Sequence, residues 1–193
     1  MVQMSQKQRL LIFAKYPEAG RVKTRLAKRV GAAKAAQLYR DMVTTVVAKT
    51  KPDAASFERI LYYDPPERSE AFQDWLPFLQ QQPQRGDDLG ERMSNALEES
   101  LQTAAHTVII GTDCIDIDSE VVTSAFAALL DHDLVLGPAT DGGYYLIGCR
   151  AASPALFAGI AWSTPSVLEQ TLQRAQQLEL QVHLLDPLSD IDF

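Results

Sequence analysis

The sequence predicts an α/β protein built on a largely parallel sheet. Short apolar runs alternate along the chain with segments in which apolar residues recur at the helical period, a pattern typical of strand–helix–strand units. The length of 193 residues suits one domain with a substantial buried core. Since no proline-rich or glycine-rich linker divides the chain, we expect a single domain over residues 1–193.

The first third of the chain contains two predicted strands, the short apolar runs Leu10–Ala14 and Arg59–Tyr63. A cationic loop follows the first strand. After this loop, Gly31–Thr50 carries apolar side chains along one helical face and is predicted to be a long helix. A shorter helix is expected at Ser69–Leu76.

A capping-box pattern marks the start of the next helix. Asp88 and Glu91 have the required spacing, with Asp in place of Ser or Thr. The helix that they open has Met93, Leu97 and Leu101 on one face. We expect this face to pack against the sheet.

The second half of the chain also alternates between predicted strands and predicted helices. A strand at Thr107–Gly111 leads into an acidic turn, and either Asp118 or Ser119 caps the helix that follows, to Leu130. Two further strands are expected at Leu134–Gly137 and Tyr144–Gly148. Thr164 and Pro165 fit the cap and first position of a last helix. That helix extends to about Leu178, and a last strand is expected at Val182–Leu185.

Three loops that follow predicted strands hold the unusual residues of the chain. In open α/β sheets a ligand lies at the carboxyl ends of the strands. We therefore expect the loops after Ala14, Gly111 and Gly137 to face one crevice.

Charge is unevenly distributed along the chain. A net charge of -7 argues against a nucleic-acid-binding protein, whose binding face is usually basic. Six of the 18 Lys and Arg residues nevertheless fall in one short stretch, which contains Glu18 as its single acid: Lys15, Arg21, Lys23, Arg25, Lys28 and Arg29. An acidic protein that concentrates cations in one place is expected to bind an anionic ligand there.

The cationic loop has the chemistry of a phosphate-binding loop. Gly20 permits close approach of the backbone, and Lys15, Lys23 and Arg25 supply positive charge. The loop differs from the Walker A pattern, which requires glycine where Val22 precedes Lys23, and the chain contains no G-x-G-x-x-G dinucleotide fingerprint. The alternative interpretation is a solvated basic loop that leads into a surface helix.

The acidic turn is a candidate metal site. Asp113 lies nearest the strand end, and Mg²⁺ bound with phosphates often takes one or two carboxylates. Asp118 suits a helix cap, and the role of Asp116 stays open. Near the C-terminus, Asp190 and Asp192 offer either a second ligand or solvated tail acids.

The Asp141-Gly142-Gly143 turn allows positive φ and close approach of another group, although Asp-Gly is also an ordinary hairpin turn. The three histidines are scattered, without the spacing of a zinc site. Trp162 either packs in the core or lines the crevice expected at the carboxyl ends of the strands.

Cellular location is inferred from three absences. Two cysteines without metal-ligand spacing indicate a reducing compartment. The N-terminal segment lacks the long apolar region of a secretory signal, and no stretch reaches transmembrane length. We expect a cytoplasmic protein with no membrane partner.

Four motifs resemble the DUF2064 family, whose members include transferases associated with radical-SAM and selenium-domain genes: A-K-x-P-x-x-G-x-V-K-T-R-L, G-D-D-L-G-E-R-M, G-T-D and G-P-A-x-D-G-G-Y-Y-L-I-G. The family is similar to the nucleotide-diphospho-sugar transferase superfamily. The resemblance implies a GT-A-like (Rossmann-like) three-layer α/β/α sandwich with a mostly parallel, mixed sheet. Within the superfamily the chain looks nearest to guanylyltransferases of molybdenum-cofactor and phospholactate metabolism. It departs from the family pattern at Ile115, where the family usually has proline.

The resemblance also implies site residues. Nucleotide binding would fall to Ala14, Lys15, Gly20, Lys23, Arg25, Gly86, Asp87, Asp88 and Leu89. The catalytic contribution would come from Lys15, Lys23, Arg25 and Asp113. Mg²⁺ or Mn²⁺ would bind at Asp113 and Asp192, and the acceptor or sugar would face Asp141, Gly142 and Gly143.

The predicted function is metal-dependent group transfer from a nucleoside triphosphate or nucleotide-sugar to a small-molecule acceptor. Nucleotidyl transfer is slightly favoured, because three cations suit a triphosphate better than a diphosphate. The first alternative is a glycosyltransferase that uses a nucleotide-sugar. The second is a non-catalytic nucleotide-binding module. Two departures from the family pattern favour it: Ile115 replaces the usual proline, and the chain ends at Phe193, where the family usually continues with Thr and a short helix.

Overall fold

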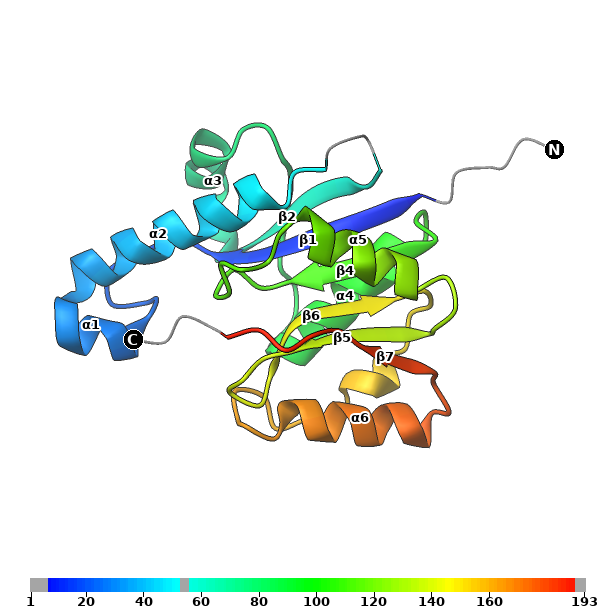
Figure 1. The fold of residues 1–193 in the computed structure, drawn as a ribbon. Coiled ribbons are helices and arrows are strands. Elements are labelled where there is room, and N and C mark those ends of the chain that lie inside the picture. Colours follow the sequence, from blue (N-terminus) through cyan, green and yellow to red (C-terminus); the bar gives the residue numbers. More distant parts are fainter. Residues whose placement is uncertain (1–6, 53–55, 190–193) are drawn as a thin grey trace.

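The structure is a computed structural model that describes residues 7–52 and 56–189. A central sheet runs through the molecule with helices on both of its faces (Figure 1). The strands are β1 (Gln8–Lys15), β2 (Glu58–Asp64), β3 (Gln80–Pro83), β4 (His106–Ile110), β5 (Leu134–Pro138), β6 (Tyr144–Cys149) and β7 (Val182–Leu184). The α-helices are α1 (Thr24–Val30), α2 (Ala32–Lys49), α3 (Ser69–Trp75), α4 (Leu89–Leu101), α5 (Ser119–Ala128) and α6 (Val167–Gln177). Two 3₁₀ turns, η1 (Pro66–Arg68) and η2 (Pro154–Phe157), complete the described elements.

The sheet is mixed but mostly parallel, as predicted. Its strand order is β3-β2-β1-β4-β6-β5-β7. β6 runs antiparallel to both of its neighbours, and every other pair is parallel. The reversal places the start of β6 at the same edge of the sheet as the carboxyl ends of β1 and β4.

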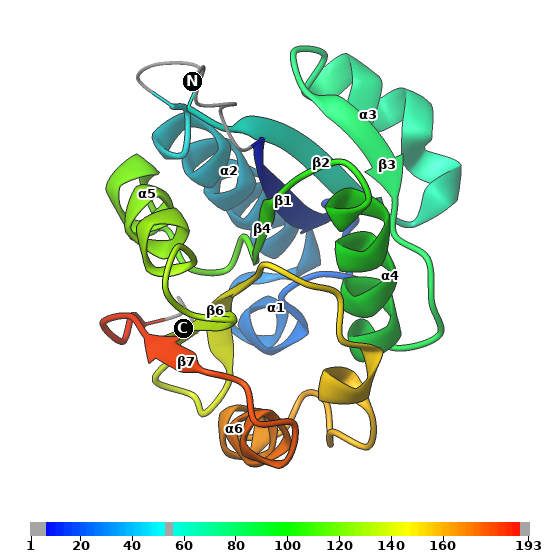
Figure 2. The ribbon, with the colours of Figure 1, turned by 90° about the vertical axis from the view of Figure 1, so that its right-hand side faces the viewer.

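Alternation along the strands divides the core into two layers. In β1, Leu10 and Ile12 pack on one face of the sheet, whereas Leu11 and Phe13 pack on the other. Buried side chains of α2, α3 and α5 cover the first face, and those of α4, η2 and α6 cover the second. Figure 2 shows α5 and α2 on one side of the sheet, with α4 and α6 on the other. The predicted three-layer α/β/α arrangement is therefore confirmed.

Besides the two 3₁₀ turns, β3 and α1 were not predicted from the sequence. β3 is polar, with the sequence Gln-Gln-Gln-Pro, and it forms the edge of the sheet next to β2. The Gln81 amide donates to the carbonyl oxygens of Phe72 and Leu76, which ties this edge to the end of α3. α1 is a short helix within the stretch predicted as loop, and Gly31, at φ 87, separates it from α2.

Helix starts match the sequence patterns in part. Asp88 caps α4 through its carboxylate, which accepts from the Glu91 N–H at 2.9 Å. The Glu91 carboxylate reaches back to the N–H of Asp87, one residue earlier than a standard capping box. At α5, the cap is Asp118, which accepts from two backbone N–H groups, and Ser119 is the first helical residue.

The last helix begins later than predicted. Thr164 and Pro165 lie before α6, which starts at Val167 with Ser166 in the cap position. The Thr164 hydroxyl donates to the Ala161 carbonyl instead of capping the helix. Within the described residues, no helix combines the length and the apolar character needed to cross a bilayer.

Candidate functional site

A cavity of about 840 Å³ lies at the carboxyl ends of β1 and β4 and is larger than the second cavity described below. This volume is in the range of small-molecule sites. Residues from the loop after β1, the segment before α4, the loop after β4 and the start of β6 line it. The crevice expected from the sequence is therefore present, although the loop after β5 does not line it among the described residues.

The structure brings most of the predicted site residues to this cavity. Those in its lining are Ala14, Lys15, Lys23, Arg25, Asp87, Asp88, Leu89 and Asp113. Those that lie outside the lining are Gly20, Gly86, Asp141, Gly142 and Gly143. Asp192 lies outside the described residues, as does Asp190.

The cationic loop presents four positive side chains to the cavity, those of Lys15, Arg21, Lys23 and Arg25. Lys28 and Arg29, from the same stretch, are exposed and do not contribute to this lining. Gly20 has φ 83 in the turn that the Arg21 N–H closes by donating to the Glu18 carbonyl. Its role is therefore in the backbone of the loop, because a left-handed conformation favours glycine.

An ion pair joins the two sides of the cavity. The Lys23 ammonium lies 3.1 Å from Oδ1 of Asp113. The Lys23 side chain is 10% exposed and that of Asp113 is 55% exposed. The first residue follows β1 and the second follows β4, so the pair links the predicted phosphate-binding loop to the predicted metal-binding turn.

Tyr39, which the sequence analysis did not single out, holds the ends of β1 and β4 together. Its hydroxyl accepts from the Lys15 N–H at 3.0 Å and lies 3.1 Å from the Thr112 hydroxyl. Burial, reinforced by the negative charge of Asp113, raises the pKa of Tyr39 to about 12. The phenol is therefore neutral at physiological pH. A tyrosine within the apolar stripe of α2 was the signal available in the sequence.

The segment before α4 is fixed by Gly86 and Arg92. Gly86 has φ 138, and a Cβ atom there would lie 2.8 Å from the Arg92 backbone nitrogen. The Arg92 side chain donates to the Gly86 carbonyl at 3.0 Å and pairs with Asp64 at 3.1 Å. Arg92, also not predicted, thus connects this segment to the end of β2 and lines the cavity.

Trp162 both packs and lines the cavity. Its ring stacks on Phe157, with a distance of 6.4 Å between centroids. A Cβ atom on Gly90 would lie 2.5 Å from the indole nitrogen. Glycine in the first turn of α4 therefore creates the space that the indole occupies.

The Asp-Gly-Gly turn packs against the segment before α6. The Asp141 carboxylate accepts from the Gly143 N–H at 2.9 Å. Gly142 has φ 91, and a Cβ atom there would lie 2.0 Å from the Pro165 carbonyl oxygen. These contacts explain the turn structurally. Tyr144 and Tyr145, which follow it directly, are the residues that enter the cavity lining.

The residues fit a divalent cation that arrives with a phosphate ligand. Over residues 7–52 and 56–189, no three His, Cys, Asp or Glu side chains gather to form a metal site. Asp113 is half exposed beside the cationic loop, whereas Asp118 is used as a helix cap and Asp116 lies outside the lining. One carboxylate suits Mg²⁺ or Mn²⁺ when phosphate oxygens and water complete the coordination.

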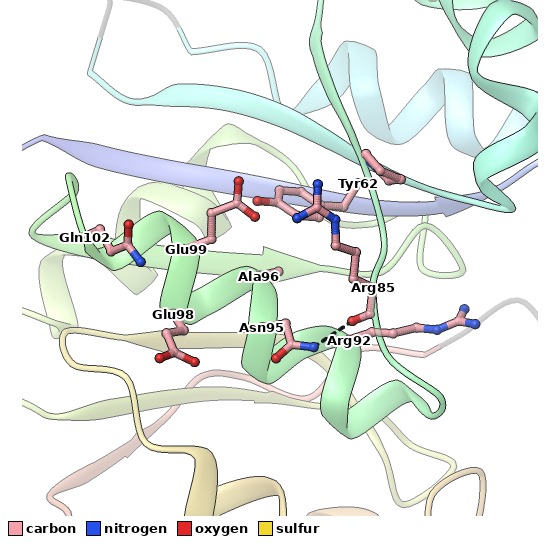
Figure 3. Close-up of a pocket in the computed structure, with 9 residues that line it drawn as sticks. Tyr62, Arg85, Arg92, Asn95, Ala96, Glu98, Glu99 and Gln102 are labelled. Carbon is pink, nitrogen blue, oxygen red and sulfur yellow. Dashed lines mark hydrogen bonds between the residues drawn. The ribbon is translucent and has the colours of Figure 1, made fainter.

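A second cavity of about 300 Å³ lies between the end of β3 and α4 (Figure 3). Figure 3 shows Tyr62, Arg85 and Glu99 around it, with the Asn95 amide donating to the Arg85 carbonyl. It shares Arg92 with the larger cavity. None of the predicted site residues that the structure describes lines it, so the larger cavity is the candidate site.

Similar structures share the fold over nearly the whole chain. A protein of Desulfovibrio desulfuricans G20, provisionally described as a nucleotide-diphospho-sugar transferase, is 36% identical with a TM-score of 0.91, over 97% of this chain and 83% of that chain. CMP:2-keto-3-deoxy-manno-octonic acid synthetase, solved with CTP, is 12% identical with a TM-score of 0.61, over 96% of this chain and 93% of that chain. Glucosyl-3-phosphoglycerate synthase of Mycobacterium tuberculosis was solved with Mn²⁺, UDP and glucosyl-3-phosphoglycerate. It is 12% identical with a TM-score of 0.53, over 96% of this chain and 71% of that chain. The last two show a common fold alone.

In sequence, residues 47–164 match the DUF2064 family, described as uncharacterized protein conserved in bacteria. None of the curated proteins compared with the chain is similar to it in sequence. The family match covers more than half of the chain, and the 36% identical relative covers nearly all of it. The chain therefore belongs to the DUF2064 family and has the fold of the nucleotide-diphospho-sugar transferases.

Proposed function

We propose that the protein is a metal-dependent nucleotidyltransferase that binds a nucleoside triphosphate in the larger cavity. The observation that carries the proposal is the convergence of four cationic side chains and Asp113 on one cavity at the carboxyl ends of β1 and β4. A triphosphate needs this much positive charge to offset its own. The position is also the one at which open α/β sheets bind ligands.

In the proposed reaction, an oxygen of an acceptor phosphate attacks the α-phosphorus. The bond from that phosphorus to the oxygen bridging to the β-phosphate breaks, and pyrophosphate leaves. Lys15, Lys23 and Arg25 bind the phosphates and stabilise the additional negative charge of the transition state, chiefly through electrostatics and positioning. Tyr39 holds the Lys15 backbone in place.

Asp113 would hold Mg²⁺ or Mn²⁺, which would supply Lewis-acid stabilisation of the phosphate oxygens. The segment Asp87-Asp88-Leu89, together with Trp162, would surround the base, because these residues line the same cavity beyond the cationic loop. The small-molecule acceptor would enter near Tyr144, which follows the Asp-Gly-Gly turn.

The first test is thermal stability with each common nucleoside triphosphate and nucleotide-sugar, with and without Mg²⁺ or Mn²⁺. A ligand at about 100 times its Kd stabilises the folded state by about 2.7 kcal/mol, which raises the Tm of a chain of this size by roughly 5–10 °C. We expect a metal-dependent shift with one triphosphate. If no donor shifts the Tm, the nucleotide-site proposal is wrong.

A pair of variants in α1 provides the control. Arg25 and Lys28 are both exposed on this helix, but Arg25 lines the cavity and Lys28 does not. Arg25→Ala is expected to weaken triphosphate binding roughly 10- to 100-fold, because a hydrogen bond to a charged group contributes about 1.5–3 kcal/mol. Lys28→Ala removes the same charge and should leave the affinity unchanged. Equal losses in both variants would indicate general attraction rather than a site.

The released product separates the reaction classes. With the donor identified, nucleotidyl transfer releases pyrophosphate, whereas glycosyl transfer from a nucleotide-sugar releases a nucleoside diphosphate. A binding module releases neither. Asp113→Asn should abolish turnover in an enzyme, and a binding module would retain its metal-free nucleotide affinity.

A further inference from the structure

The two residues of the Lys23–Asp113 ion pair have different proposed roles in the cavity. Lys23 belongs to the proposed phosphate-binding loop, and Asp113 is the proposed metal ligand. The ammonium lies 3.1 Å from Oδ1 of the carboxylate. A divalent cation bound to the same oxygen would place two positive centres within a few ångströms of each other, which is strongly unfavourable.

The position of the ammonium is well defined by the fold. The Lys23 side chain is 10% exposed, and Val22 and Leu26, on either side of it in sequence, are buried. Lys23 has φ 44 and ψ 49, in the left-handed region. This conformation is unfavourable for a residue with a side chain, so packing around the start of α1 must maintain it. Asp113, by contrast, is 55% exposed and accessible to an incoming cation.

We propose that Lys23 and a divalent cation compete for Asp113, and that Lys23 thereby couples metal binding to nucleotide binding. The proposal rests on the function proposed above. A nucleotide brings phosphate oxygens to which the ammonium can turn from its place beside Asp113. The metal and the nucleotide then favour each other, whereas the metal alone has to displace the ammonium.

This coupling is reciprocal. The factor by which a triphosphate increases the metal affinity equals the factor by which the metal increases the triphosphate affinity. Removing the ammonium should therefore increase the affinity for the metal alone and reduce its dependence on the nucleotide. Couplings between sites are usually in the range of 5- to 150-fold.

The test measures Mn²⁺ binding by electron paramagnetic resonance, with Mn²⁺ as the sole ligand. Lys23→Met keeps much of the side-chain volume without the charge, and Lys23→Gln is a second neutral variant in case the first is poorly folded. We expect both to bind Mn²⁺ about tenfold more tightly than the original protein. Lys28→Met, which removes a charge outside the cavity, should leave Mn²⁺ affinity unchanged.

Asp113→Asn in combination with Lys23→Met should remove the gain in Mn²⁺ affinity, which assigns it to the ion pair. Binding of inorganic tripolyphosphate in the presence of a chelator should weaken in Lys23→Met, because a phosphate-binding cation is lost. Unchanged or weaker Mn²⁺ binding by both neutral variants would overturn the coupling. A gain in Mn²⁺ affinity that persists with Asp113→Asn would overturn it as well.

The failures of the two proposals are distinguishable. If no triphosphate binds the original protein but Lys23→Met gains Mn²⁺ affinity through Asp113, the competition is real and the nucleotide function is wrong. If a triphosphate binds with metal but the neutral variants show no gain, the nucleotide function stands and the competition is wrong.

Discussion

The Tyr39 hydroxyl is a single group on which two loops of the candidate site depend. It accepts from the Lys15 N–H and shares a hydrogen bond with Thr112; the first contact is partly buried and the second is buried. Tyr39→Phe would leave the Lys15 N–H without this acceptor. The cost of an unsatisfied group of this kind is about 1–3 kcal/mol. We expect that loss in the free energy of urea unfolding, together with weaker triphosphate binding.

Tyr63→Phe is the comparison variant, because Tyr63 is a buried tyrosine of β2 outside the cavity lining. It should leave triphosphate affinity unchanged. If Tyr39→Phe binds the triphosphate as well as the original protein, the hydroxyl stabilises the fold without positioning the loop.

We expect His106 to make the free energy of unfolding depend on pH. It is the first residue of β4 and is buried, and its Nδ1 has no hydrogen-bond partner in the described part of the chain. Burial, with a contribution from Arg150, lowers the pKa of His106 below its ordinary value of 6.5. As pH falls through 6.5, the unfolded chain takes up the proton before the folded chain does, so stability is lost.

The expected result is a free energy of unfolding that decreases more between about pH 7.5 and pH 5.5 in the original protein than in His106→Gln, measured by urea denaturation. Carboxylates that titrate in the same range affect both proteins equally. Identical slopes for the two proteins would contradict the assignment to His106.

Among the site residues, the charged groups could be proposed from the sequence, whereas the residues that arrange them could not. Lys15, Lys23 and Asp113 stand out in the sequence because they lie at the end of an apolar strand or in the loop after one, and the structure brings all three to the larger cavity. Tyr39 and Arg92 reach the cavity from the buried face of one helix and the first turn of another. Their contacts depend on how the helices pack, which no local pattern reports.

Among the structural elements, α4 makes room for the cavity wall at Gly90. A Cβ atom there would lie 2.5 Å from the Trp162 indole nitrogen. We expect Gly90→Ala to displace the indole, with a changed tryptophan fluorescence spectrum and a loss of about 1–3 kcal/mol in unfolding free energy from overpacking. Gly111→Ala is the matched control, since Gly111 also lines the cavity but has open space around its Cβ position. An unchanged spectrum in Gly90→Ala would show that the helix, not the indole, moves.

The elements that the sequence predicted well are those with an apolar face. β1 is a continuous apolar run that is buried on both faces of the sheet, and α2 carries buried residues at the helical period, so both patterns are clear. β3 is polar, forms one edge of the sheet, and bonds through Gln81 to the carbonyl oxygens of Phe72 and Leu76 at the end of α3. α1 has seven residues, of which Arg25, Lys28 and Arg29 are charged, and packing against α2 rather than its own pattern maintains it. Such elements depend on tertiary contacts.

On the scale of the whole molecule, one sheet extends through all of the described strands, and the single domain predicted over residues 1–193 can be tested by cooperativity. The two tryptophans report on different halves. Trp75 lies in α3 and contacts Arg40 and Thr44 of α2, whereas Trp162 packs at Gly90 of α4 and on Phe157 of η2. A single cooperative unit unfolds with coincident transitions at both probes.

We expect the single-tryptophan variants Trp75→Phe and Trp162→Phe to show, for each one, the same urea midpoint by fluorescence and by circular dichroism. Agreement within each variant is the criterion, because the substitutions themselves alter stability. A fluorescence midpoint below the circular dichroism midpoint in only one variant would indicate that the half around its remaining tryptophan unfolds separately.

The two edges of the sheet affect the tendency of the protein to aggregate at high concentration. β3 has four residues and ends at Pro83, which has no N–H to offer, while β7 has three residues. A neighbouring chain that adds to a sheet needs a row of unpaired backbone groups as its template. Neither edge strand provides a long row of such groups. We therefore expect the protein to withstand high concentration without forming fibrils, even though the strands inside its sheet are strongly apolar.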